Sequence, residues 1–200
     1  MNPNDAATYV VLGNVYASAE MWSEYTSIYN NMVKNKIQKI PGATWVTVNK
    51  KIHVFHVDSE HEYLYINIYI YIYKRYSIII WNCCRYKLNI KSLLDDLILI
   101  FVNTYNYKPL TSCIFQPNLT HTEKIEQLWL HSEKLAAAFA ILFSASSTDP
   151  IIMHKNLRVC HDCHTFLKLF STYFQRKFII RDSKRFHHFE NGTCSCKDYW

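Results

Sequence analysis

Hydrophobic residues recur at helical spacing between Asp5 and Lys34. Apolar side chains stand at Tyr9 and Tyr16 and again at Trp22 and Tyr25, with polar residues between them. This period predicts two amphipathic helices. Neither helix has enough apolar partners to form a core alone, which is typical of one unit of a helical-repeat array. We therefore interpret residues 1–36 as a helical-repeat-like hairpin.

A turn at Pro41-Gly42 separates this region from a different pattern. Thr44–Val48 and Lys51–Val57 alternate between apolar and polar residues, and Asn49-Lys50 lies between them. A period of two on both sides of a short polar turn predicts a β-hairpin. We assign it to residues 37–62.

The segment 63–92 is low in complexity and consists largely of tyrosine and isoleucine. Lys74 and Arg75 interrupt its apolar run, which is therefore too short for a membrane-spanning helix. Such a β-prone stretch predicts either a sheet-forming edge or an aggregation-prone segment. Cys83 and Cys84 have no histidines nearby, so we give them no role.

From Leu93 onward the pattern alternates between helix and strand. Glu123–Phe143 predicts a helix, Ile151–Val159 a strand, His161–Phe174 a helix and Lys177–Arg181 a strand. This order in so short a stretch predicts an α/β layered domain, which we place at residues 93–200.

Composition narrows the function. The chain has 200 residues, half of them hydrophobic, and a formal net charge of +6, which suits a polyanionic partner such as RNA. Three glycines leave no glycine-rich phosphate loop. Met1–Thr8 has no basic region followed by an apolar run, so we expect no signal peptide there, no membrane partner, and any organellar targeting segment to lie outside this chain.

The cysteines indicate metal rather than disulfides. Their number, seven, is odd, and four of them form Cys-x-x-Cys and Cys-x-Cys pairs close to histidines. Thiols at this spacing beside imidazoles are typical of metal sites in a reducing compartment.

One set of residues fits catalytic zinc. Such a site needs three protein ligands and an open position for a water molecule, and His131, Cys160 and Cys163 are three ligands. Glu133 is then a spare carboxylate, placed to take a proton from the bound water molecule and pass it to the substrate. His-x-Glu followed by Cys-x-x-Cys is the zinc nucleobase-deaminase signature, although Val159 stands where the signature has proline. Because helical residues two apart point about 200° apart, we expect a helix break near His131. A purely structural zinc is the alternative.

A second set fits a closed zinc site. Cys194 and Cys196 provide two thiols, and His164 with either His187 or His188 completes a tetrahedron. A site with four protein ligands cannot bind a water molecule, so this zinc has the structural task of holding the tail. Two unpaired surface thiols are the alternative.

Several strings together resemble a known family. They are His131-Ser-Glu-Lys-Leu-Ala136, Lys155-Asn-Leu-Arg-Val-Cys160, Arg185-Phe-His-His-Phe189, Cys194-Ser-Cys196 and the terminal Asp198-Tyr-Trp200. In this order and spacing they resemble the DYW domain of plant pentatricopeptide repeat proteins, over about residues 119–200. The region around Tyr9–Tyr16, Trp22 and Pro41–Trp45 is similar to the E-type extension and PG box that precede this domain.

The resemblance implies a cytidine deaminase-like α/β fold with two zinc sites and C-to-U editing of organellar RNA in mitochondria or chloroplasts. It implies that His131, Cys160 and Cys163 bind the catalytic zinc, that Glu133 shuttles protons, and that a second zinc is held by His164, His187, Cys194 and Cys196.

Single-stranded RNA is the expected substrate, and target choice falls to upstream repeats or to editing-factor partner proteins. Segment 63–92 has no counterpart in the family pattern. A non-catalytic zinc module that binds RNA or a partner, disabled by this insertion, is the main alternative, and a metal-dependent ribonuclease is a weaker one.

Overall fold

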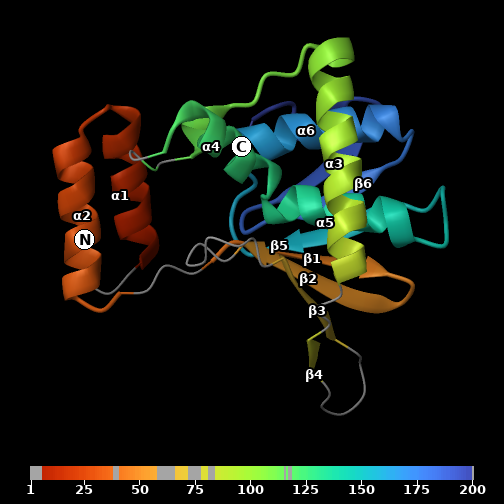
Figure 1. Cartoon of the computed structure of the whole chain (residues 1–200), viewed down its shortest axis with the longest axis horizontal. Helices are drawn as coiled ribbons and strands as arrows, with labels where there is room; N and C mark the ends of the chain where they lie inside the picture. Colours follow the sequence, from red (N-terminus) through yellow and green to blue (C-terminus); the bar gives the residue numbers. More distant parts are fainter. Residues whose placement is uncertain are drawn as a thin grey trace.

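The computed structural model describes residues 6–37, 41–57, 66–71, 78–80, 84–114, 116 and 119–199. Its first element is a hairpin of α1 (Ala6–Ser18) and α2 (Trp22–Lys34), which stands beside the main body (Figure 1). Tyr9 of α1 and Tyr25 and Met32 of α2 are buried. The two helices predicted between Asp5 and Lys34 are confirmed.

A mixed sheet forms the centre of the molecule, with the strand order β4-β3-β2-β1-β5-β6-β7-β8. Only β5 and β6 run parallel, and the other neighbours are antiparallel. The strands are β1 (Ala43–Val48), β2 (Lys51–Val57), β3 (Ile66–Tyr71), β4 (Ile78–Ile80), β5 (Ile151–Lys155), β6 (Phe178–Arg181), β7 (Phe186–Glu190) and β8 (Thr193–Cys194). The predicted hairpin after Pro41-Gly42 therefore joins β5 through β1.

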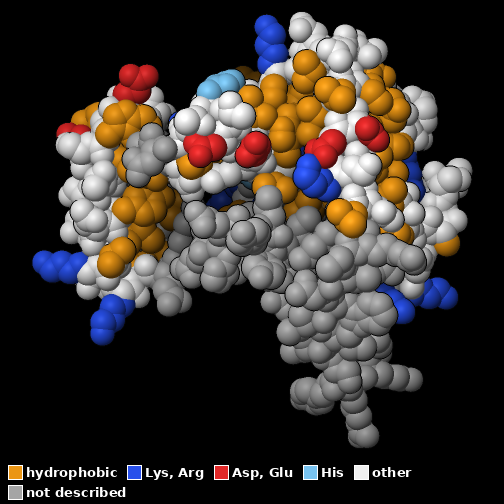
Figure 2. All heavy atoms as spheres, viewed as in Figure 1, with side chains coloured by type: hydrophobic (Ala, Val, Ile, Leu, Met, Phe, Trp, Pro, Cys, Tyr) orange, Lys and Arg blue, Asp and Glu red, His pale blue; other side chains and the backbone are white. Residues whose placement is uncertain are grey.

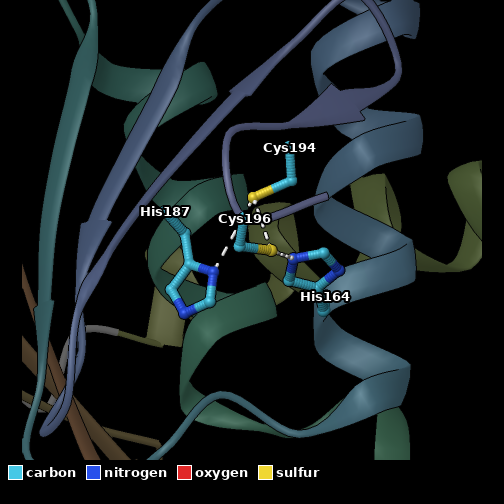
Figure 3. A group of neighbouring side chains, drawn as sticks. All are labelled: His164, His187, Cys194 and Cys196. Atoms are coloured by element: carbon cyan, nitrogen blue, oxygen red, sulfur yellow. Dashed lines mark hydrogen bonds between the residues drawn. The ribbon is translucent and has the colours of Figure 1, made fainter. Parts of the chain in front are cut away.

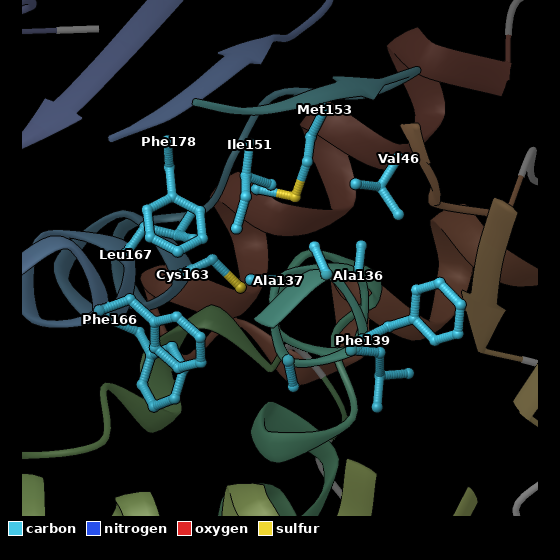
Figure 4. Close-up of a cluster of buried hydrophobic side chains, with 14 of the residues drawn as sticks. Val46, Ala136, Ala137, Phe139, Ile151, Met153, Cys163, Phe166, Leu167 and Phe178 are labelled. Atoms are coloured by element: carbon cyan, nitrogen blue, oxygen red, sulfur yellow. The ribbon is translucent and has the colours of Figure 1, made fainter. Parts of the chain in front are cut away.

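Helices α5 (Ser132–Phe143) and α6 (His161–Tyr173) pack against this sheet, and α3 (Cys84–Tyr105) packs against α5 (Figure 1). Helix α4 (His121–Trp129) contacts the 3-10 turn η1 (Thr111–Cys113). Helix α5 lies at the centre, where Ala136, Ala137 and Ala138 have no exposed surface. Figure 4 shows Ala136 and Ala137 in the same buried cluster as Met153 of β5 and Phe166 of α6. Small side chains let α5 approach its neighbours closely. The predicted α/β layered fold is confirmed.

Two details of the sequence interpretation differ from the structure. We predicted a strand over Ile151–Val159, but β5 ends at Lys155. The chain leaves the sheet there because the Asn156 side chain accepts from the backbone N–H of Ala43 (2.8 Å) and donates to the carbonyl of Pro41 (2.9 Å). Strands β7 and β8 were not predicted, because the residues in this part of the sequence were interpreted only as metal ligands.

The described parts of segment 63–92 extend the sheet at one edge as β3 and β4, as the sequence predicted. Residues 84–92 form the start of α3, which is one continuous helix across positions 92 and 93. The domain boundaries stay a prediction. The side chains of Cys83 and Cys84 lie outside the described residues.

Apolar side chains also remain on the surface. Figure 2 shows them gathered over α3 and over the α1–α2 hairpin. On α3 they include Leu88, Leu99 and Val102. Within the residues described, no helix combines the length and apolar character needed to cross a bilayer.

Candidate active site and metal centres

The break between α4 and α5 places His131 at a helix start. Helix α4 ends at Trp129, α5 begins at Ser132, and His131 between them has the extended angles φ −56° and ψ 134°. Its carbonyl accepts from the backbone N–H of Lys134 at 3.0 Å, so His131 is the N-cap residue of α5. The helix break that the His-x-Glu spacing required is confirmed.

The two thiols of Cys-x-x-Cys open a second helix. Cys160 is the N-cap of α6, and its sulfur accepts a hydrogen bond from the backbone N–H of Cys163 at 3.4 Å. The positive end of the helix dipole favours thiolates at this position. The helix predicted from His161 therefore begins directly after Cys160, and Cys163 lies in its first turn.

These two helix starts bring three ligand atoms together. Nδ1 of His131 lies 3.4 Å from Sγ of Cys160 and 3.4 Å from Sγ of Cys163. A zinc ion about 2.3 Å from each sulfur and about 2.0 Å from a nitrogen requires ligand atoms roughly 3.5 Å apart. The cluster therefore has the dimensions of a zinc site with three protein ligands.

Cys113 lies beside this cluster, although nothing in its sequence context singled it out. Its thiol hydrogen-bonds Cys160, and this bond, followed by burial, raises the pKa of Cys113. The same bond, together with one from Cys163, holds the pKa of Cys160 well below its usual range. Burial raises the pKa of Cys163. Cys160 is thus the sulfur best prepared to ionise, which metal binding requires.

Glu133 lies in the first turn of α5 and is 2% exposed. Its Oε2 accepts hydrogen bonds from Nζ of Lys155 (2.8 Å) and from the Ser132 hydroxyl (3.2 Å). Glu133 is not one of the three grouped ligand residues. The carboxylate is therefore fixed by an ion pair with β5, a partner that the sequence analysis did not identify.

The second predicted set also comes together (Figure 3). Nε2 of His164 lies 3.2 Å from Sγ of Cys196, Nδ1 of His187 lies 3.7 Å from Sγ of Cys194, and the two sulfurs are 3.3 Å apart. His187, and not His188, belongs to the group. The choice between them follows from β7, because alternate residues of a strand face opposite sides.

Both histidines of this group have a carboxylate on the other ring nitrogen. Oδ2 of Asp182 lies 3.2 Å from Nε2 of His187, and Oδ1 of Asp198 lies 3.6 Å from Nδ1 of His164. Burial, and then the charge of His187, lowers the pKa of His164 to about 4, and burial lowers that of His187. Neutral imidazoles oriented by carboxylates are typical metal ligands.

An α/β layer with three grouped His and Cys side chains at two helix starts and four more in the tail fits a domain of the nucleic acid deaminase type, and both groups could hold a metal ion. Comparison with known proteins agrees. Residues 106–200 match the DYW family of nucleic acid deaminases, and residues 1–47 match the E motif.

Full-length relatives extend the match over the whole chain. A putative pentatricopeptide repeat-containing protein of Arabidopsis thaliana is 38% identical over 197 residues, which is 98% of this chain and 21% of that protein. A mitochondrial one from the same plant is 36% identical over 200 residues, covering 100% of this chain and 25% of its own length. A chloroplastic one is 38% identical over 201 residues, covering 100% of this chain and 20% of its own length.

The chain thus carries a DYW domain of the kind found in pentatricopeptide repeat proteins, preceded by an E motif. It spans about a fifth to a quarter of the length of these relatives.

Proposed function

We propose that this chain is the catalytic part of an RNA-editing protein and deaminates cytidine to uridine hydrolytically. The observation that carries the proposal is the convergence of His131, Cys160 and Cys163 within 4.8 Å of one another, with Glu133 fixed one residue into the adjoining helix. The residues fit zinc in number, donor type and spacing. A zinc ion with three protein ligands supplies the Lewis acidity that makes a water molecule nucleophilic near neutral pH.

The chain's own contribution to the chemistry centres on Glu133. One oxygen, Oε2, is held by Lys155 and Ser132, so the carboxylate has a defined orientation. In the proposed reaction Glu133 accepts one proton from water and delivers it to the cytosine ring nitrogen N3. It then carries the second proton, from the hydroxyl group added at C4, to the amino group, which leaves as ammonia while the C4 carbonyl forms. Burial at 2% exposure shields these transfers from bulk water.

The second cluster has a structural task in this proposal. His164 and His187 with Cys194 and Cys196 form four ligands, a set that leaves no position for a reacting water molecule. It ties β7, β8 and the chain end to α6. We therefore propose two zinc ions, one catalytic and one structural.

The substrate we propose is single-stranded RNA, because an unpaired base avoids most of the cost of leaving a helical stack. Exposed basic residues near the second cluster, including Arg158 and Lys184, provide contacts to phosphate. Upstream repeats of a longer protein, or partner proteins, choose the target. Relatives named mitochondrial and chloroplastic support an organellar location.

Glu133→Ala tests the proposal, with Glu126→Ala, an exposed glutamate of α4, as matched control. Both proteins are tethered to an RNA that contains a target cytidine, and their metal content is measured by elemental analysis. We expect two zinc ions in both and a loss of cytidine conversion of about 10²- to 10⁴-fold for Glu133→Ala alone.

Unchanged conversion by Glu133→Ala removes this residue from the mechanism. A parent chain that holds both metals and binds RNA but converts no cytidine supports the non-catalytic binding module instead.

A further inference from the structure

The carboxylate of Glu133 belongs to a hydrogen-bonded network that reaches outside the matched deaminase region. Its four members are Glu133 and Ser132 of α5, Lys155 of β5 and Thr44 of β1. Nζ of Lys155 donates to Oε2 of Glu133 and to Oγ of Ser132, both at 2.8 Å. The hydroxyls of Thr44 and Ser132 are 2.9 Å apart.

Proton counting gives a consistent set of directions for these bonds in which Ser132 donates to Glu133. The Ser132 hydroxyl has a single hydrogen, which it donates to Oε2 of Glu133 at 3.2 Å. Its oxygen therefore accepts from Lys155 and from Thr44, so Thr44 is the donor in the remaining bond. In the series of hydrogen bonds from Thr44 to Ser132 to Glu133, each hydroxyl then donates toward the carboxylate.

The network is buried. Thr44 has no exposed surface, Ser132 and Glu133 are each 2% exposed, and the Lys155 side chain is 8% exposed. Buried polar groups are strongly held by their partners because water cannot replace a lost bond. The position of the carboxylate is thus coupled to the position of β1.

Residues just before and at the start of β1 pack closely around Lys155 and its neighbour Asn156. A methyl group added at Gly42 meets Nζ of Lys155 at 3.2 Å, so a larger residue crowds the ammonium group. Asn156, next to Lys155, hydrogen-bonds Pro41 and Ala43. The Pro41–Thr44 segment is therefore fastened to both the strand that carries Lys155 and the helix that carries Glu133.

We propose that Thr44 and Lys155 are positioning residues for Glu133, so that the segment before the deaminase domain sets the geometry of its acid–base group. The inference rests on the proposed function, in which Glu133 moves the proton. It assigns the Pro-Gly turn and β1 an indirect part in catalysis: Thr44 holds Ser132, which together with Lys155 holds one oxygen of Glu133 and leaves the other for proton transfer.

The test compares Thr44→Val and Lys155→Met with two matched controls. Thr47→Val makes the same change at an exposed position of the same strand. Lys177→Met removes the cation of another Lys–Glu pair, the surface pair with Glu190 at 3.1 Å. For all four, kcat and KM on tethered and free RNA, metal content and thermal unfolding are measured, with Glu133→Ala in parallel.

We expect kcat to fall about 10- to 100-fold for Lys155→Met and several-fold for Thr44→Val, with KM and both metals retained, because displacement of a reacting group by about 1 Å costs up to about 10²-fold. Thr47→Val and Lys177→Met should match the parent chain. Cobalt in place of zinc gives a readout independent of turnover. Its ligand-field spectrum should shift in Lys155→Met and Glu133→Ala in the same sense, and stay unchanged in the controls.

Thr44→Val preserves side-chain size, so it remains informative if Lys155→Met does not fold. Parent-like kcat in Thr44→Val, or a fall in kcat matched by Thr47→Val, overturns the positioning role. Loss of activity in Glu133→Ala together with parent-like Lys155→Met also overturns it while leaving the proposed function intact. Full activity in Glu133→Ala removes the proposed function itself.

Discussion

A buried ion pair joins the two helix starts that carry the candidate active site. Nζ of Lys134 donates to Oδ2 of Asp162 at 2.5 Å, and both side chains have no exposed surface. Oδ1 of Asp162 also accepts from the Tyr107 hydroxyl (2.7 Å) and from the backbone N–H of Leu110 (2.9 Å). Lys134 is one helical turn from His131, and Asp162 lies between Cys160 and Cys163. The Lys134–Asp162 ion pair therefore holds the helix start that carries the imidazole close to the helix start that carries the two thiols.

Lys134→Met removes the ammonium group and keeps the length of the side chain. It leaves the Asp162 carboxylate buried with neutral donors only. Removing one partner of a buried pair costs about 3–5 kcal/mol, because the remaining charge stays out of water without its counter-ion. Against a total stability of about 5–15 kcal/mol, this is a large fraction of the folding free energy.

Urea unfolding at fixed free zinc measures the effect. With a slope of about 1–3 kcal/mol per molar urea, the midpoint should fall by more than about 1 M at unchanged slope. The double variant Lys134→Met/Asp162→Asn should cost about 2 kcal/mol less than the sum of the single ones, since the two groups are in contact.

The control is Lys91→Met in the exposed pair with Asp95, where the Nζ–Oδ2 distance is 2.7 Å and the side chains are 64% and 54% exposed. Its cost should stay below about 1 kcal/mol. A cost for Lys134→Met no larger than this control refutes the view that the buried charge pair holds the two helix starts together.

Two further predictions concern pH and metal affinity. Burial lowers the pKa of His53, so the unfolded chain takes up the proton first as pH falls. The neutral, buried His53 imidazole stabilises the fold fully above about pH 6.5, and this contribution is lost as the pH falls toward the lower pKa that His53 has in the folded chain. His53→Leu should therefore reduce the dependence of the unfolding free energy on pH, on the acid side, by up to about 1.4 kcal/mol per pH unit. An identical slope in urea titrations of both proteins contradicts this. Asp182→Asn should weaken binding of one zinc equivalent about 10- to 100-fold in chelator competition, because Asp182 orients His187. Asp95→Asn should have no effect, and equal losses in the two variants would count against the orienting role.

Local sequence patterns were sufficient for much of the site. The His131-x-Glu133 spacing on a helical stretch required a break, and the structure has it between Trp129 and Ser132. The helix predicted from His161 also begins at that residue, with Cys160 as its N-cap and Cys163 in its first turn. The four residues of the tail cluster were also identified from spacing, except that His187 and His188 could not be separated before β7 was known.

Contacts between residues far apart in sequence could not be predicted from these local patterns. Thr44 and Ser132 are 88 positions apart in sequence, and Lys155 meets Glu133 across 22 positions. Cys113 lies beside Cys160, and Leu110, three residues before Cys113, is hydrogen-bonded to Asp162 in the first turn of α6. Such contacts follow from the arrangement of helices and strands, for which no local period exists.

The sequence by itself determined the donor types and where each helix that carries them begins, because caps and ligand spacings depend on neighbours a few residues away. Only the tertiary structure decided which charge faces Glu133, which histidine of β7 turns inward, and that β1 shares a sheet with β5. These depend on which surfaces the chain can bury together, since the free energy of burial is gained between segments distant in sequence.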